Sequence, residues 1–132
     1  TQSIADGGTL ELVAEDLLAT HPWRAAAQDP QRVVFSRFAQ ERWLPITAAD
    51  HLTAVTDVAR GLIALGVEPG DRVALMANTR YEWLLIDQAS WAAGAAAVPI
   101  YPSSAPPQVE WIVSDSGARV VVVPGAILAH LP

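Results

Sequence analysis

Few side chains in this sequence have the type and spacing that catalysis needs. The three histidines, His21, His51 and His130, are separated by 30 and 79 residues, and none stands near a carboxylate at the spacing of metal ligands. We therefore expect surface or helix-capping roles for them. All eight basic residues are arginines, and the chain has no lysine and no cysteine. This composition excludes Walker-type phosphate loops, Schiff-base chemistry and cysteine-ligated metal sites.

The remaining candidates lie in a loop, Tyr101–Ser104, between a predicted strand and a predicted helix. In open α/β sheets, ligands bind in the crevice beyond the carboxyl ends of the strands. Residues 78–80 and 124–125 are expected at the same edge of the sheet. The start of the following helix could bind an anion, but Pro106 and Pro107 have no N–H and remove two donors. A wall that contacts part of a larger ligand is one interpretation, and a purely structural loop is the favoured one.

Length and composition indicate one globular domain. The chain has 132 residues, of which 52% are hydrophobic and 17% charged, which excludes a disordered or collagen-like chain. The net charge of −6 argues against binding to nucleic acid or to an anionic membrane surface. The longest weakly polar run, residues 89–100, is shorter than the roughly 20 residues of a membrane span. The first eight residues lack the features of a signal peptide, so a cytoplasmic location is expected.

The N-terminal half is predicted to contain a flexible tail, a short helix and a hairpin. Residues 1–8 are the tail, whereas residues 9–19 fit a strand or one helical face equally well. A helix is expected over 22–28. The β-branched and aromatic runs 32–38 and 42–46 predict an antiparallel hairpin over 32–46.

A capping box marks the start of the next helix. Thr47 is followed three residues later by Asp50, so each side chain can bind the other residue's free N–H. Leu52, Val55, Ala59, Leu62 and Ile63 then recur at helical spacing, and Gly66 is placed to end the helix.

The second half predicts alternating strands and helices. The strands are expected at 73–77, 95–100 and 120–123, and the helices at 80–93 and 106–116. Strands joined by single helices form a parallel sheet through right-handed crossovers. The fold class is therefore α/β: a partial doubly wound parallel sheet of β-α-β-α-β order, preceded by the antiparallel hairpin.

Two further expectations concern the core and the C-terminal end. Trp83, Trp91 and Trp111 lie on predicted helices whose apolar faces need filling, so core positions are favoured for them, whereas Trp43 is the tryptophan expected to be exposed. Residues 125–132 look like the start of another apolar helix. This segment stops without a helix cap, so the sequence reads as truncated.

Three runs occur in an order typical of one enzyme family. They are Leu62–Ala74 (LIALGVEPGDRVA), Asn78–Trp83 (NTRYEW) and Val98–Ser104 (VPIYPSS). Together they span much of residues 46–123, and this stretch resembles the N-terminal region of adenylate-forming acyl-CoA synthetases, the AMP-binding superfamily. The second and third runs look most like those of bacterial long-chain fatty-acid–CoA ligases.

The resemblance implies a two-step ligase that uses ATP, Mg and CoA. A fatty acid would react with ATP to give an acyl-adenylate, and the CoA thiol would then displace AMP. The phosphate loop, the nucleotide-binding segments and the catalytic lysine of such enzymes lie downstream of this region, so no group that holds ATP or Mg is expected in this chain. Residues 9–132 would be the N-terminal subdomain, with the hairpin at 32–46, an α/β unit at 47–123 and the start of the next segment at 124–132. It would be inert alone.

The resemblance also suggests one site. In relatives that use CoA, the segment that matches Tyr101, Pro102, Ser103 and Ser104 borders the CoA channel. Ala105 and Pro107 depart from the family pattern, which commonly has a hydroxyl residue and an acid there.

Two other functions fit the residues. One is a freestanding α/β module that binds a protein, or a second copy, through an open sheet edge near residues 95–100. The other is a fragment of a different adenylate-forming ligase. No catalytic or metal-binding residue and no nucleic-acid partner is assigned.

Overall fold

The computed structural model describes residues 17–129. The expectations for the tail at 1–8 and for most of 9–19 therefore lie outside the described residues. The described part begins with a 3₁₀ turn, η2, followed by the predicted helix and hairpin. The elements are η2 (Leu18–Thr20), α1 (His21–Gln28), β1 (Val33–Ala39), β2 (Arg42–Thr47) and α2 (Ala48–Ala64).

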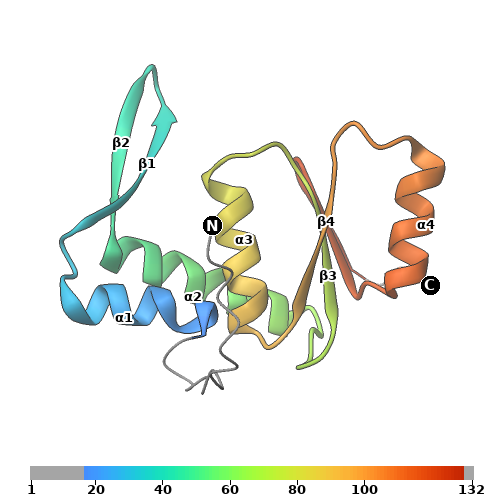
Figure 1. The fold of residues 1–132 in the computed structure, drawn as a ribbon, viewed down its shortest axis with the longest axis horizontal. Coiled ribbons are helices and arrows are strands. Elements are labelled where there is room, and N and C mark those ends of the chain that lie inside the picture. Colours follow the sequence, from blue (N-terminus) through green and yellow to red (C-terminus); the bar gives the residue numbers. More distant parts are fainter. Residues whose placement is uncertain (1–16, 130–132) are drawn as a thin grey trace, which may run out of the picture.

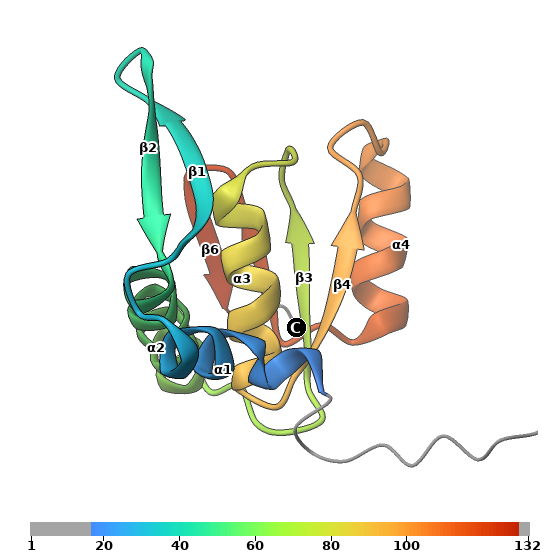
Figure 2. The same cartoon turned by 60° about the vertical axis from the view of Figure 1, so that its left-hand side comes forward.

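The predicted hairpin is confirmed. Strands β1 and β2 pair antiparallel, and the two residues between them, Gln40 and Glu41, both have positive φ angles of 52° and 60°. Such a two-residue loop matches the right-handed twist of the strands. Figures 1 and 2 show the hairpin standing out from the helices α1 and α2.

The capping box at the start of α2 is also confirmed. The N–H of Asp50 donates to the Thr47 hydroxyl oxygen at 3.1 Å, and the N–H of Thr47 donates to the Asp50 carboxylate at 3.4 Å. The chain turns after this helix at Gly66, whose φ angle is 90°, as its predicted role as a helix end requires.

The second half forms the predicted β-α-β-α-β unit. Its elements are β3 (Arg72–Met76), α3 (Tyr81–Ala92), β4 (Ala96–Ile100), α4 (Pro106–Ser116) and β5 (Val120–Val123). Strand β3 pairs in parallel with both β4 and β5. The helices α3 and α4 lie on opposite sides of this sheet (Figure 1), as a doubly wound sheet requires.

Side chains of β3 alternate between two apolar clusters. Val73 and Leu75 pack with residues of α2 and α3, whereas Ala74 packs with Ile100 and the inward side of α4. All three β3 side chains are fully buried. This explains why the strand shows no polar alternation, since it is covered on both faces.

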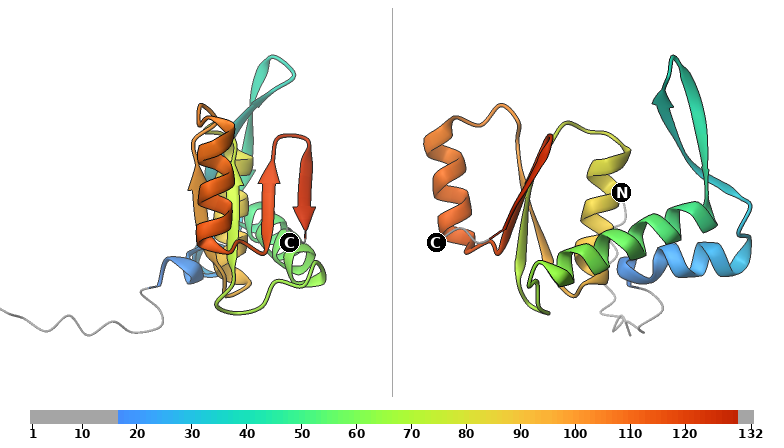
Figure 3. Two further views of the ribbon diagram at one scale, coloured as in Figure 1. Left: turned by 90° about the vertical axis from the view of Figure 1, so that its right-hand side faces the viewer. Right: turned by 180° about the vertical axis from the view of Figure 1, so that it is seen from behind.

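The helix expected from residue 125 onward is wrong. Residues Ala126–Ala129 form a strand, β6, which pairs antiparallel with β5 and gives the sheet the order β4-β3-β5-β6 (Figure 3). Gly125, with a φ angle of 84°, completes a tight turn. The apolar run therefore covers the open edge of β5, and its backbone groups form hydrogen bonds with those of β5.

Residues 17–129 include no helix with the length and apolar character of a membrane span.

Candidate functional site

The loop Tyr101–Ser104 lies where it was predicted, directly after β4 at the carboxyl edge of the sheet. The N–H of Ser104 donates to the carbonyl of Tyr101 at 2.9 Å, which closes the loop as a turn. The Tyr101 side chain is 81% exposed. Because the turn is closed by the backbone, the aromatic ring is free to face a ligand.

A pocket of about 340 Å³ lies between this loop and the one after β3. The first loop contributes Tyr101 and Pro102, and the second contributes Asn78 and Thr79, with Trp83 of α3 behind them. The structure thus brings together two of the three loops that were expected at this edge, whereas residues 124–125 line neither this pocket nor the groove described next. Its wall combines apolar rings with a few polar groups, as small-molecule sites commonly do.

A second, shallower groove of about 470 Å³ lies on the other side of Tyr101. Tyr101 and Ser104 form one wall, and Gln108 and Trp111 of α4 form the other. The groove is almost entirely apolar. Tyr101 therefore separates two recesses, whereas Ser103 lines neither of them.

The core position expected for Trp111 is wrong, because its side chain is 65% exposed. Val109, Ile112 and Val113 of α4 pack against the sheet, as predicted. Residue 111 follows Val109 by two positions, which is about 200° around a helix, so it points away from that contact. Trp83 packs against the core cluster, and Trp43 is exposed as expected.

The start of α4 has few free donors. Pro106 and Pro107 have no N–H, and the N–H groups of Gln108 and Val109 donate to the carbonyl of Ala105 at 2.9 and 3.1 Å. The Ala105 N–H donates to Gln108 Oε1 at 2.9 Å. This is one of the two hydrogen bonds of a capping box, and it forms without a side-chain hydroxyl at position 105. This helix end is therefore poorly suited to hold a phosphate.

No group of three or more His, Asp or Glu side chains among residues 17–129 is arranged to hold a metal ion.

The surface role expected for His51 is wrong. This residue of α2 is 2% exposed and lies between two polar partners on α3. Its Nε2 is 2.6 Å from Gln88 Oε1, and its Nδ1 is 3.0 Å from the Tyr81 hydroxyl. Because Oε1 only accepts, Nε2 carries the proton and Nδ1 accepts from Tyr81. Phe35 of β1 packs against the imidazole edge at 4.8 Å between ring centroids.

Burial keeps this cluster uncharged. It lowers the pKa of His51, although the hydrogen bond to Gln88 opposes the change. Burial likewise raises the pKa of the Tyr81 hydroxyl. A neutral imidazole and a neutral phenol are what the hydrogen-bond pattern requires. The cluster joins the hairpin, α2 and α3 and so positions the start of α3 beside the first pocket.

A signal for the burial of His51 is present in the sequence. His51 precedes Val55, Ala59 and Leu62 at spacings of four, four and three residues, which places it on the apolar face of the predicted helix. Tyr81 and Gln88 carry no comparable signal, because their partner lies on another helix.

Comparisons with known proteins agree with this architecture. A model of the family described as AMP-binding enzyme matches residues 22–131. Long-chain-fatty-acid–CoA ligase FadD15 of Mycobacterium bovis is 40% identical over 106 residues, which cover 80% of this chain and 18% of that protein. Long-chain-fatty-acid–CoA ligase FadD13 of Mycobacterium tuberculosis is 37% identical over 101 residues, or 76% of this chain and 18% of that protein.

Solved structures show the same likeness. A fatty acyl-CoA synthetase of Mycobacterium tuberculosis superposes with a TM-score of 0.67 at 33% identity, covering 78% of this chain and 20% of that one. The chain thus spans about a fifth of the length of the relatives it matches.

Proposed function

The chain belongs to the AMP-binding enzyme family, and from this premise we propose that it is the N-terminal subdomain of a long-chain fatty-acid–CoA ligase. The observation that carries the proposal is the 40% identity to FadD15 over 106 residues. In the proposed reaction, a fatty-acid carboxylate attacks the α-phosphate of ATP, forming an acyl-adenylate and releasing pyrophosphate. The CoA thiol then attacks the acyl carbon, forms the thioester and releases AMP.

The role proposed for residues 9–132 is to support this chemistry, not to perform it. Among residues 17–129, no group of three or more His, Asp or Glu side chains is arranged to hold a metal ion, and the start of α4 offers few free N–H donors to a phosphate. We therefore assign the groups that hold ATP and its Mg to the part of the ligase that follows this region in relatives. Such an enzyme would work in the cytoplasm, where ATP and CoA are available.

Within this role, we propose that Tyr101, Pro102, Ser103 and Ser104 form part of the wall of the CoA channel. Support comes from the exposed ring of Tyr101 and from the two recesses beside it. Aromatic side chains provide large contact areas in such walls, worth about 0.5–1.5 kcal/mol per ring contact.

The function is tested in a chimera. This chain replaces the matching segment of FadD15, and fatty-acid-dependent ATP–pyrophosphate exchange is measured for the chimera, for FadD15 and for the isolated chain. We expect exchange from the chimera and none from the isolated chain. Exchange by the isolated chain would contradict the supporting role. A chimera that melts like FadD15 but exchanges with no fatty acid would contradict the assignment as a ligase.

The CoA wall is tested in the same chimera with Tyr101→Ala. The proposal predicts a loss of about three- to tenfold in kcat/KM for CoA, the factor that one aromatic contact supplies, with unchanged exchange because CoA is absent from the first step. Phe38→Ala, which removes another exposed ring far from this loop, is the matched control. An equal loss in both steps, or no loss in either, contradicts the assignment of Tyr101.

A further inference from the structure

The segment that enters α3 forms one side of the pocket between the two loops. Residues 77–80 join β3 to α3, and Asn78 and Thr79 in this segment line the pocket. The β3 end of the segment is fixed, because the middle of that strand is fully buried. At the α3 end, the Arg80 side chain forms no capping hydrogen bond with the described residues. The position of Asn78 and Thr79 therefore depends on what holds Tyr81, the first residue of α3.

His51 holds Tyr81 from a fixed base on α2. The capping box directly before His51 fixes the start of α2. From there the imidazole accepts from the Tyr81 hydroxyl at 3.0 Å and donates to Gln88 at 2.6 Å. Tyr81 and Gln88 are seven residues apart, which is about two turns, so they lie on the same face of α3. One buried side chain thus bonds α3 at its first residue and again two turns later.

We propose that His51 is a positioning residue of this pocket, which it shapes through Tyr81, and that protonation of His51 releases this hold. In the neutral imidazole, Nδ1 accepts from the Tyr81 hydroxyl. Once protonated, Nδ1 can only donate, so the hydroxyl must turn and accept instead. The new charge also lies in a buried site, which costs free energy unless the site rearranges. The start of α3 then shifts, and the wall formed by Asn78 and Thr79 moves with it. The consequence for CoA rests on the proposed function.

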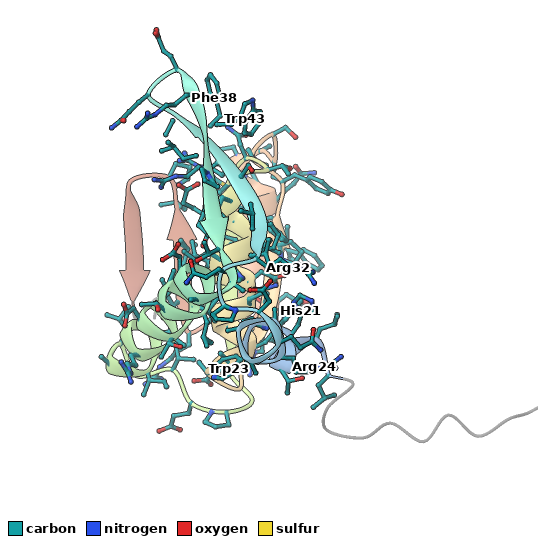
Figure 4. All side chains as sticks on the ribbon, turned by 90° about the vertical axis from the view of Figure 1, so that its left-hand side faces the viewer. His21, Trp23, Arg24, Arg32, Phe38 and Trp43 are labelled. Atoms are coloured by element: carbon teal, nitrogen blue, oxygen red, sulfur yellow. The ribbon has the colours of Figure 1, made fainter. Side chains whose placement is uncertain are left out.

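The charges around the imidazole do not offset its protonation. Besides burial, the positive charge of His21 on α1 lowers the pKa of the imidazole; Figure 4 shows His21 below the hairpin. Arg37 of β1, Asp50 of α2 and Glu82 of α3 are the charges that act on the neighbouring phenol, after burial, which raises the phenol pKa. These three are already engaged, since Arg37 pairs with Glu82 and Asp50 belongs to the capping box. Protonation therefore leaves an uncompensated charge at the contact between α2 and α3.

The first test is a pH titration of the 132-residue chain followed by nuclear magnetic resonance. The His51 imidazole and the backbone amides of Asn78 and Thr79 are recorded between about pH 7.5 and 5. We expect both amides to shift with the midpoint of His51. In Tyr81→Phe, which removes only the hydroxyl, His51 should still titrate, but the shifts of the two amides should fall severalfold. Amides that ignore the midpoint of His51, or that follow it equally in Tyr81→Phe, would overturn the proposal.

His21→Gln is the matched control, because it removes the other nearby imidazole and leaves the hydrogen bond between His51 and Tyr81 in place. Both amides should still follow His51, whose midpoint should move slightly upward because a positive neighbour is lost. Loss of the coupled shifts in this variant would assign them to His21 and overturn the proposal. Phe38→Ala, near the tip of the hairpin in Figure 4, should change neither the midpoint nor the amide shifts.

The second test uses the chimera with FadD15. Tyr81→Phe should raise KM for CoA by about two- to tenfold, the factor that one hydrogen bond supplies, while ATP–pyrophosphate exchange stays unchanged. His51→Asn, whose Oδ1 can accept from Tyr81 but does not titrate, should keep KM low and abolish its rise between about pH 7 and 6.

Equal losses in exchange and in the CoA step, or a rise of KM with acid that persists in His51→Asn, would contradict a positioning role. The spectra of the isolated chain need no ligase activity. A chimera that performs no exchange would therefore count against the proposed function, whereas the first test would still decide whether His51 positions the pocket.

Discussion

The hairpin and the parallel sheet are both built from short strands, but these strands are held in different ways. In the sheet, Val73, Leu75 and Val120 are completely buried. In the hairpin, no side chain of either strand is buried. The sheet therefore depends on the removal of apolar surface from water, which has no directional requirement.

The hairpin depends instead on a few directed contacts. Phe35 packs on His51 and Tyr81, and Arg37 forms an ion pair with Glu82 of α3 at 3.3 Å. Such contacts require particular protonation states and geometries. The comparison teaches that the sheet should respond mainly to changes in volume, whereas the hairpin should respond to changes in polarity and pH.

The largest expected effect is loss of volume in the sheet. Leu75→Ala leaves a cavity in a fully buried cluster, which should lower the free energy of unfolding by about 2–5 kcal/mol. Leu44→Ala in strand β2 should lower the free energy of unfolding clearly less, because the Leu44 side chain is only partly buried and its truncation leaves no enclosed cavity. Urea unfolding of both variants measures the difference. Equal losses would mean that the hairpin is packed like the sheet.

Replacement of His51 tests whether the cluster of His51, Tyr81 and Gln88 holds the hairpin to α2 and α3. His51→Phe keeps a ring in place but leaves the Tyr81 hydroxyl and the Gln88 oxygen without their buried partner, at a cost of about 1–3 kcal/mol. Amide hydrogen exchange should rise in β1 and β2 more than in β3. His21→Phe, at an exposed position on α1, is the control and should change neither. An equal rise in amide exchange in the hairpin strands and in β3 would contradict a role of His51 in holding the hairpin.

The same contrast explains what could be predicted from the sequence. Contacts within one element are visible as spacings, so the capping box of Thr47 and Asp50 and the apolar run of β3 were predicted correctly. Contacts between elements are not visible in this way. The imidazole of His51 is stabilised by two side chains 30 and 37 positions away, Tyr81 and Gln88. No sequence pattern near His51 identifies these partners.

The C-terminal strand shows a second limit. Residues 126–129 are apolar and lack internal alternation, so periodicity does not distinguish a strand from a helix there. The open edge of β5 decides the outcome, because it offers hydrogen-bonding partners to the next extended segment. The candidate loop Tyr101–Ser104 was placed correctly because its position follows from the order of the strands alone, whereas the exposure of Trp111 depends on the face that α4 turns to the sheet.

The buried imidazole of His51 predicts that the free energy of unfolding depends on pH. Burial places its folded-state pKa below the unfolded value of about 6.5, so the unfolded chain binds the proton more readily. Stability is then fully present above about pH 6.5 and falls as the pH drops from there toward the folded-state pKa. Urea unfolding between about pH 7.5 and 5.5 measures this loss. The loss should be absent in His51→Phe, and its persistence there would assign the pH dependence to another group.

The smallest expected effect concerns the ion pair between Arg37 and Glu82. Their side chains are 46% and 33% exposed, and pairs in such surroundings contribute about 0.2–1 kcal/mol, less as salt is added. Arg80 holds the same carboxylate more closely, at 2.6 Å, and its hydrogen bond is the main reason that the pKa of Glu82 is lowered. Glu82 therefore stays ionised and in place when Arg37 is removed. Arg37→Ala should leave global unfolding almost unchanged but increase exchange at the hairpin amides, and a double-mutant cycle with Glu82→Gln isolates the coupling. A coupling well above 1 kcal/mol would show that this ion pair, and not the His51 cluster, holds the hairpin to α3.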